Sequence, residues 1–166
     1  YHWSARKIGD AEGGDLIETG EGSCLLRVDS TDPEDPVRNI TIVPVHLVEV
    51  FDSGEVFNPE WIERIEDFRA VRFMDWMQTN NNEQKVWGDR PEPGDRSYAT
   101  NGVPAEVMIR LANEINADPW FNMPHQVDDD YFRRFATLVK ERLNPHLTAY
   151  VEHSNEVWNW IFDQSH

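Results

Sequence analysis

The chain has 166 residues and a mass of 19.4 kDa, which is the length of one ordinary domain with a single core. A formal charge of −16 and a sequence pI near 4.6 argue against a nucleic-acid partner, because phosphate binding relies on clustered Lys and Arg. No apolar run approaches the roughly 18 residues of a membrane span, so we expect no membrane partner either.

The cysteine content and the first residues bear on the compartment. The one cysteine, Cys24, permits no internal disulfide and matches no zinc pattern, so we interpret it as a packing residue. The sequence begins at Tyr1 without a Met or a signal-peptide core, which suggests an excised piece. The acidic composition fits a saline or extracellular habitat, and we expect an extracellular or periplasmic location.

Residues 1–38 predict a β-hairpin region. Two short segments, 15–19 and 23–28, are separated by Gly20-Glu21-Gly22, which favours two strands joined by a turn. The run 31–36 contains two prolines and is expected to break regular structure. This hairpin either caps the bottom of a barrel or belongs to a small β-domain, and residues 39–166 form a second unit.

The second unit predicts strands that alternate with helices. The run 39–46 is β-branched and apolar on both faces, as in a strand buried in a parallel sheet. Asn58-Pro59 predicts an N-cap and a first helical position, and apolar residues at helical spacing follow. Residues 70–76 then predict a second strand.

A long polar insert, residues 78–100, follows this second strand. Loops of this length inside compact domains are usually functional or disordered. Trp87 in the insert is either a platform for a sugar ring or an anchor that pins the loop, and the sequence leaves both interpretations open.

Two more repeats follow the insert. Pro104 opens a helix with one apolar stripe, and residues 120–123 predict a third strand. The run 128–130 is Asp-Asp-Asp, which lacks the spacing of a calcium loop and is explained by capping of the next helix. Residues 147–153 predict the fourth strand. Four strands alternating with three helices indicate right-handed βαβ units and a parallel sheet.

Polar side chains follow the predicted strands at the point where each one ends. In a barrel of parallel strands these ends lie on one face, so the side chains should converge. The candidates are His46 after the first strand, Arg72, Asp75 and Trp76 at the second, His125 at the third, and His153, Asn155 and Glu156 at the fourth.

The order of these residues resembles the clan A glycoside hydrolases. In that clan an Arg on the second strand supports the catalytic carboxylates, a His on the third contacts sugar hydroxyls, and Asn-Glu ends the fourth. The matching residues here are Arg72, His125, Asn155 and Glu156.

The segments 73–76, 123–125 and 154–159 are also similar to uncharacterised bacterial cellulase-like or "cellulose-binding" barrel proteins. The resemblance implies an α/β fold: the N-terminal half of a TIM-type (β/α)8 barrel, strands one to four, preceded by a short β-hairpin region. A complete barrel takes roughly 250 residues.

By this resemblance Glu156 is the general acid/base, and Asn155 binds the 2-hydroxyl of the sugar. Trp158 and Trp160 are expected to form an apolar wall that raises the pKa of the Glu156 carboxyl. Alternatively, Glu156 caps a following helix and both tryptophans belong to the core. His125 and His153 are each open to a purely structural interpretation, as partners of backbone groups.

Glycosidases normally use two carboxylates, and in clan A the nucleophile ends a seventh strand, which this chain lacks. Glu152 is a second acid, but its place inside the fourth predicted strand indicates a buried partner for Arg72. The chain then carries half a catalytic site, completed by a missing C-terminal half or by self-association.

The first function expected is a glycoside hydrolase-like domain that acts on a poly- or oligosaccharide, with Glu156 as acid/base. The alternative is a non-catalytic carbohydrate-binding protein with tryptophan platforms. A protein-interaction domain, marked by a wide apolar patch without a polar cleft, is the third. No residue pattern indicates a metal or another cofactor. The expected substrate-binding residues are Trp76, Asp75, His153, Trp158, Trp87 and His46.

Overall fold

A computed structural model describes residues 5–11, 14–19, 27, 29–36 and 40–166. The chain divides into two units, Tyr1–Pro44 and Val45–His166, and each is described by itself. The division follows Pro44, somewhat later than the boundary after residue 38 that the sequence predicts.

The first unit contains an antiparallel hairpin of β1 (Ala5–Ala11) and β2 (Gly14–Thr19). Arg6 lies opposite Glu18, and the register shifts between Lys7 and Gly9. The predicted strand 15–19 is therefore present, but it pairs with the segment before it. Its expected partner at 23–28, the Gly20-Glu21-Gly22 turn and Cys24 fall outside the described residues, except Arg27, which has no regular structure.

The second unit contains a parallel sheet with strand order β3-β4-β5. Its strands are β3 (Ala70–Arg72), β4 (Asp118–Met123) and β5 (Tyr150–His153). Its α-helices are α1 (Val48–Asp52), α2 (Pro59–Ile65), α3 (Ala105–Glu114) and α4 (Asp129–Arg142). Its 3-10 turns are η1 (Val45–Leu47), η2 (Trp87–Asp89) and η3 (Asp163–Ser165).

The two long helices begin where their sequences favour it. The side chain of Asp128 accepts a hydrogen bond from the backbone N–H of Tyr131 at 2.8 Å and so caps α4. Asp129 and Asp130 lie in the first turn, where the helix dipole favours acidic side chains. The predicted capping role of the three aspartates is confirmed. Pro104 immediately precedes α3, and Asn58 caps α2 through the N–H of Glu60 at 2.8 Å.

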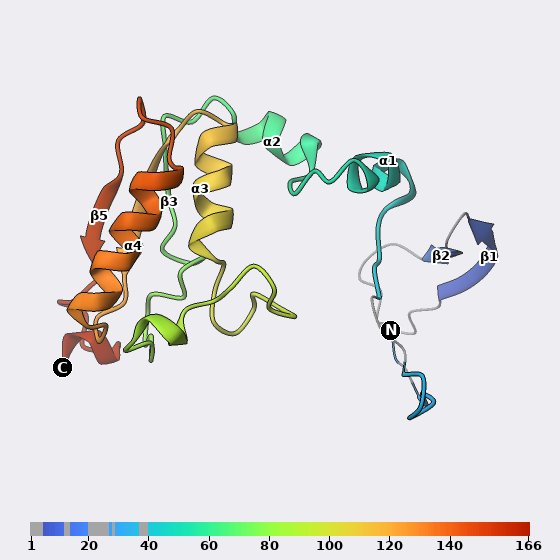
Figure 1. The fold of residues 1–166 in the computed structure, drawn as a ribbon, viewed down its shortest axis with the longest axis horizontal. Helices are drawn as coiled ribbons and strands as arrows, with labels where there is room; N and C mark the ends of the chain where they lie inside the picture. Colours follow the sequence, from blue (N-terminus) through green and yellow to red (C-terminus); the bar gives the residue numbers. More distant parts are fainter. Residues whose placement is uncertain (1–4, 12–13, 20–26, 28, 37–39) are drawn as a thin grey trace. The chain divides into compact units, whose positions relative to one another are not determined.

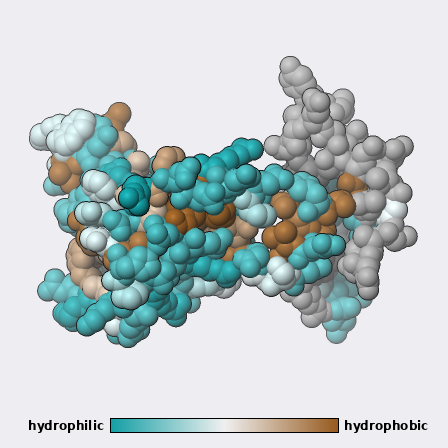
Figure 2. All heavy atoms as spheres, turned by 90° about the horizontal axis from the view of Figure 1, so that it is seen from above, coloured by the Kyte–Doolittle hydropathy of each residue, from teal (hydrophilic) through white to brown (hydrophobic). Residues whose placement is uncertain are grey.

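The core lies between the sheet and helices α3 and α4, which run side by side (Figure 1). Successive strand residues point to opposite faces, and in β4 Phe121 and Met123 point to the helices. The ring of Phe121 lies 5.0 Å from that of Phe135 in α4. Most of the visible surface of the described residues is hydrophilic, with smaller hydrophobic patches between the polar side chains (Figure 2).

The opposite face of the sheet remains accessible to solvent in the part of the chain that the structure describes. Trp120 of β4 is 39% exposed and Tyr150 of β5 is 47% exposed, with their rings 6.0 Å apart. Arg72 of β3 lies in register with Trp120 on this face. We call this surface the open face.

This unit is a small α/β domain with four helices and a three-stranded parallel sheet among the described residues. It is not half of a (β/α)8 barrel, so that expectation was wrong. The predicted first strand is absent: residues 40–44 have no regular structure, η1 and α1 follow, and Asn39 lies outside the described residues. Ile40 and Ile42 are 52% and 67% exposed, unlike the residues of a strand buried in a parallel sheet.

None of the described helices combines the length and the apolar composition that crossing a membrane requires.

Candidate functional site

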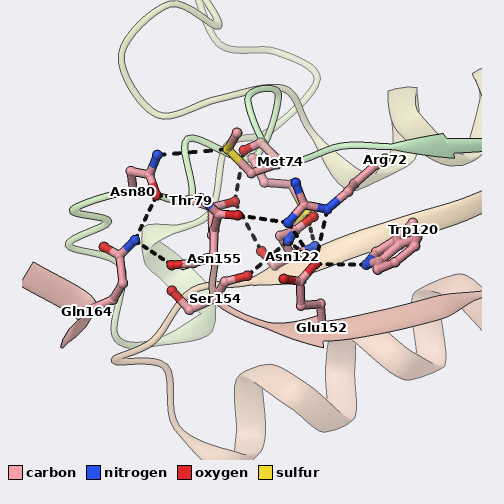
Figure 3. A network of polar contacts seen from close by, with 11 residues as sticks. Arg72, Met74, Thr79, Asn80, Trp120, Asn122, Glu152, Ser154, Asn155 and Gln164 are labelled. Atoms are coloured by element: carbon pink, nitrogen blue, oxygen red, sulfur yellow. Dashed lines mark hydrogen bonds and ion pairs between the residues drawn. The ribbon is translucent and has the colours of Figure 1, made fainter. Parts of the chain in front are cut away.

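Glu152 is the centre of a polar cluster on the open face (Figure 3). Its Oε2 accepts hydrogen bonds from Nε and Nη2 of Arg72 at 3.1 and 2.8 Å, from Nε1 of Trp120 at 3.0 Å and from Nδ2 of Asn122 at 2.7 Å. The predicted pairing of Glu152 with Arg72 is confirmed. The pair is only partly buried, because the two side chains keep 31% and 36% of their surface exposed.

The cluster extends to the end of β5 through Asn155. Nη2 of Arg72 donates to Oδ1 of Asn155 at 2.8 Å, and Nδ2 of Asn155 donates to Oδ1 of Asn80 at 3.0 Å. Both ends of the Asn155 amide are therefore oriented, and the residue is 6% exposed. We call Arg72, Trp120, Asn122, Glu152 and Asn155 the Glu152 cluster.

Glu156 lies just outside this cluster, in the turn that follows β5. Its Oε2 accepts a hydrogen bond from Nδ2 of Asn159 at 2.8 Å. The described residues 154–166 contain no α-helix, so Glu156 does not cap one there. Trp158 and Trp160 are 72% and 77% exposed, so they neither belong to the core nor enclose the Glu156 carboxylate in an apolar wall.

His125 follows the C-terminal end of β4, at the same end of the parallel sheet as the turn after β5. Burial lowers the pKa of His125, the charge of His153 lowers it further, and Asp163 partly offsets both effects. Nε2 of His125 lies 3.1 Å from the side-chain nitrogen of Gln126, and its Nδ1 has no hydrogen-bond partner among the described residues. The Nδ1 atom of His125 is thus a buried polar atom without a protein partner among the described residues.

Two predicted tryptophan platforms are occupied by protein contacts. Trp76 stacks on Trp61 with ring centroids 6.0 Å apart and also lies 5.5 Å from Phe73. Trp87 meets Tyr131 edge-on at 5.3 Å, and the guanidinium of Arg90 lies over the Trp87 ring, 4.6 Å from its centroid. The structure therefore favours the anchor interpretation of Trp87.

His46 and Asp75 lie outside the Glu152 cluster. His46 belongs to η1 instead of a strand end, and its Nε2 lies 3.5 Å from Oε1 of Glu60. Asp75 is exposed in the turn after β3. The first strand on which the position of His46 depended is absent.

The sequence did not predict Trp120 and Asn122 as members of the Glu152 cluster. It also did not predict Asn80 and Gln164, which form hydrogen bonds with Asn155. The alternation of residues 118–123 places Trp120 and Asn122 on the face opposite Phe121, which was a usable signal. Asn80 lies in a turn and Gln164 in the short η3, where no periodicity marks them.

A separate apolar groove of about 570 Å³ lies beside α4. Its lining includes Phe132, Val139, Leu143, Leu147 and Val151. Lys140 is the charged residue in that lining, so the groove lacks the converging polar groups of a sugar site. The molecule thus has both an apolar surface and a polar cluster.

Among the described residues, no three His, Cys, Asp or Glu side chains are grouped to hold a metal ion. Comparisons with protein-family models, with curated proteins and with solved structures each found no match.

Proposed function

We propose that the protein binds a poly- or oligosaccharide at the C-terminal ends of β3, β4 and β5. The observation that carries the proposal is the 2.8 Å hydrogen bond from Arg72 to Asn155, which fixes an amide beside the exposed turn that holds Glu156. Sugar sites combine a few oriented polar groups with aromatic surface. Glu156 and His125 supply polar groups of this kind beside the buried, oriented Asn155.

Exposed aromatic rings support the same proposal. Trp158 and Trp160 follow Glu156 directly in sequence and leave most of their surface in solvent. Indole rings provide flat apolar faces for stacking, with an N–H that can still form hydrogen bonds. Trp76 and Trp87 are packed against protein rings and only partly exposed, whereas Trp160 meets His166 edge-on at 5.4 Å but stays 77% exposed, so we assign the stacking role to Trp158 and Trp160.

Hydrolysis with Glu156 as general acid/base is the second candidate. It is favoured by the oriented Asn155 next to Glu156, the same order as in clan A glycoside hydrolases. A second carboxylate is required, within about 5 to 9.5 Å. Glu152 is poorly suited to that role because its Oε2 already accepts four hydrogen bonds. Binding without turnover is therefore the better-supported function.

The test is calorimetric titration of the chain with a panel of soluble β-glucans, xylans and mannans. Trp158→Ala and Trp160→Ala should each weaken binding about 3- to 10-fold, as expected for a lost stacking contact of about 1 kcal/mol. Phe68→Ala is the matched control, because Phe68 is 57% exposed but precedes β3, at the opposite end of the strand. Wild-type affinity in both tryptophan variants, or no binding to any polysaccharide, would contradict the proposal.

Glu156→Gln separates the two candidates. Under binding without turnover, the variant keeps most of the affinity, and the wild type releases no reducing sugar. Release by the wild type but not by Glu156→Gln would instead establish hydrolysis.

A further inference from the structure

Gln164, in η3, binds the loop after β3 and the turn after β5 at the edge of the Glu152 cluster (Figure 3). It lies in η3 and is 9% exposed. Its Nε2 donates to the backbone oxygen of Asn155 at 2.7 Å and to Oδ1 of Asn80 at 2.7 Å. Its Oε1 accepts from the backbone N–H of Asn81 at 3.0 Å. One amide thus connects the turn after β5 with the loop after β3.

The backbone that Gln164 holds is strained. Ser154 and Glu156, on either side of Asn155, have φ angles of 58° and 43°, in the left-handed region that residues with a Cβ disfavour. Such conformations persist only where surrounding contacts fix them. Before Asn155, the N–H of Ser154 donates to the Met123 oxygen at 2.8 Å. At Asn155 itself, the backbone oxygen accepts the hydrogen bond from Gln164, and after it the Glu156 oxygen accepts the N–H of Asn159 at 2.8 Å.

The side chain of Asn155 depends on Gln164 as well. Oδ1 of Asn80 accepts from both Gln164 and Asn155, at 2.7 and 3.0 Å. The hydrogen bond from Gln164 orients the Asn80 amide so that its oxygen faces Nδ2 of Asn155. Oδ1 of Asn155 is then directed to Arg72.

We propose that Gln164 is a positioning residue of the sugar site: it fixes the backbone and side chain of Asn155 and thereby the direction in which Glu156 faces the ligand. This inference rests on the proposed function. Gln164 itself does not need to touch the sugar.

The test uses Gln164→Glu, which keeps the shape and the acceptor for Asn81 but loses both donated hydrogen bonds at neutral pH. Affinity for the polysaccharide that the wild type binds should fall about 10-fold. Asn155→Ala should weaken binding much less in the variant than in the wild type, because the two residues act together. Additive losses would contradict the positioning role.

The pH profile distinguishes positioning from a general loss of structure. Protonation of the introduced carboxyl at low pH restores one donor, so the ratio of wild-type to variant affinity should shrink as the pH falls. Gln164→Met, which has neither donor nor acceptor, should show no such recovery. If both variants show the same pH profile, the inference is overturned.

Asn113→Asp is the matched control. Nδ2 of Asn113 donates to the Arg142 oxygen at 2.8 Å, and its Oδ1 accepts from the N–H of Asn144 at 2.8 Å. The change therefore removes the same kind of donor where α3 and α4 end. It should lower the melting temperature as Gln164→Glu does and leave the affinity at the wild-type value. An equal loss of affinity in the control would overturn the inference.

A measurement without ligand separates failure of this inference from failure of the proposed function. In ¹H–¹⁵N spectra, Gln164→Glu should shift the resonances of Asn80, Asn81 and residues 154–156 while those of α3 stay in place. If the wild type binds no polysaccharide, the proposed function fails, and these shifts still decide whether Gln164 positions Asn155. Unchanged resonances at Asn155 and Glu156 would overturn the inference.

Discussion

Trp120 and Glu152 are joined across two neighbouring parallel strands by a 3.0 Å hydrogen bond from the indole Nε1 to the carboxylate Oε2. The guanidinium of Arg72, on β3, lies 5.7 Å from the centre of the same indole ring and forms an ion pair with the same carboxylate. One carboxylate therefore connects all three strands of the sheet on its open face.

Glu152→Gln should lower the free energy of unfolding by about 1 to 3 kcal/mol, because it removes the charge shared by four donated hydrogen bonds. Urea unfolding followed by far-UV circular dichroism measures the loss. Glu141→Gln removes an equal charge from the exposed surface of α4 and should change stability by less than about 0.5 kcal/mol. Equal stability of the two variants would show that the cluster does not stabilise the sheet.

Gly102→Ala should destabilise the domain by more than about 1 kcal/mol. Gly102 has a φ of 90°, and a Cβ there would lie 2.5 Å from the backbone oxygen of Trp76. That oxygen also accepts the N–H of Val103 at 2.6 Å, so it has little freedom to move. Thermal unfolding provides the measurement. Gly88→Ala, whose Cβ meets nothing within 4 Å, should melt close to the wild-type temperature.

Tyr131 should make the protein sensitive to alkaline pH. Burial raises the pKa of Tyr131 from 10.0 to about 12, while its hydroxyl donates to Oε1 of Gln84 at 2.9 Å. Below pH 10 both the folded and the unfolded chain keep this proton. Between pH 10 and 12 the unfolded chain releases it first, so the free energy of unfolding should fall by about 1.4 kcal/mol per pH unit.

Unfolding of the wild type and of Tyr131→Phe, compared from pH 8 to 12, isolates this contribution. The variant should be about 1 kcal/mol less stable at pH 8, because Gln84 loses a partner, and should lose less stability as the pH rises. Parallel pH profiles would contradict the assignment.

Local chemistry made part of this structure predictable. Asn58 and Asp128 cap helices because their short side chains reach the free N–H groups of a first turn. The strands β4 and β5 overlap the predicted strands because both follow a helix with one apolar stripe. The Arg72–Glu152 pair was predictable because a carboxylate inside a strand needs a partner of opposite charge.

The remaining features depended on tertiary context. Residues 40–46 are apolar on both faces, and such a short run becomes a buried strand only where layers exist to cover it. The half-barrel prediction failed together with that strand. Gln164 was not predictable as a site residue, because its role arises from the path of the chain after β5, which no periodicity in residues 154–166 encodes.

The connection order of the sheet has a consequence for the folding reaction. β3, β4 and β5 are neighbours in space but are separated by the insert and by two helices, so their contacts require the closure of long loops. Helices α3 and α4 can form from local contacts earlier. The indole of Trp120 meets the Glu152 carboxylate only when the last two strands have paired, so this hydrogen bond belongs to the late step in folding.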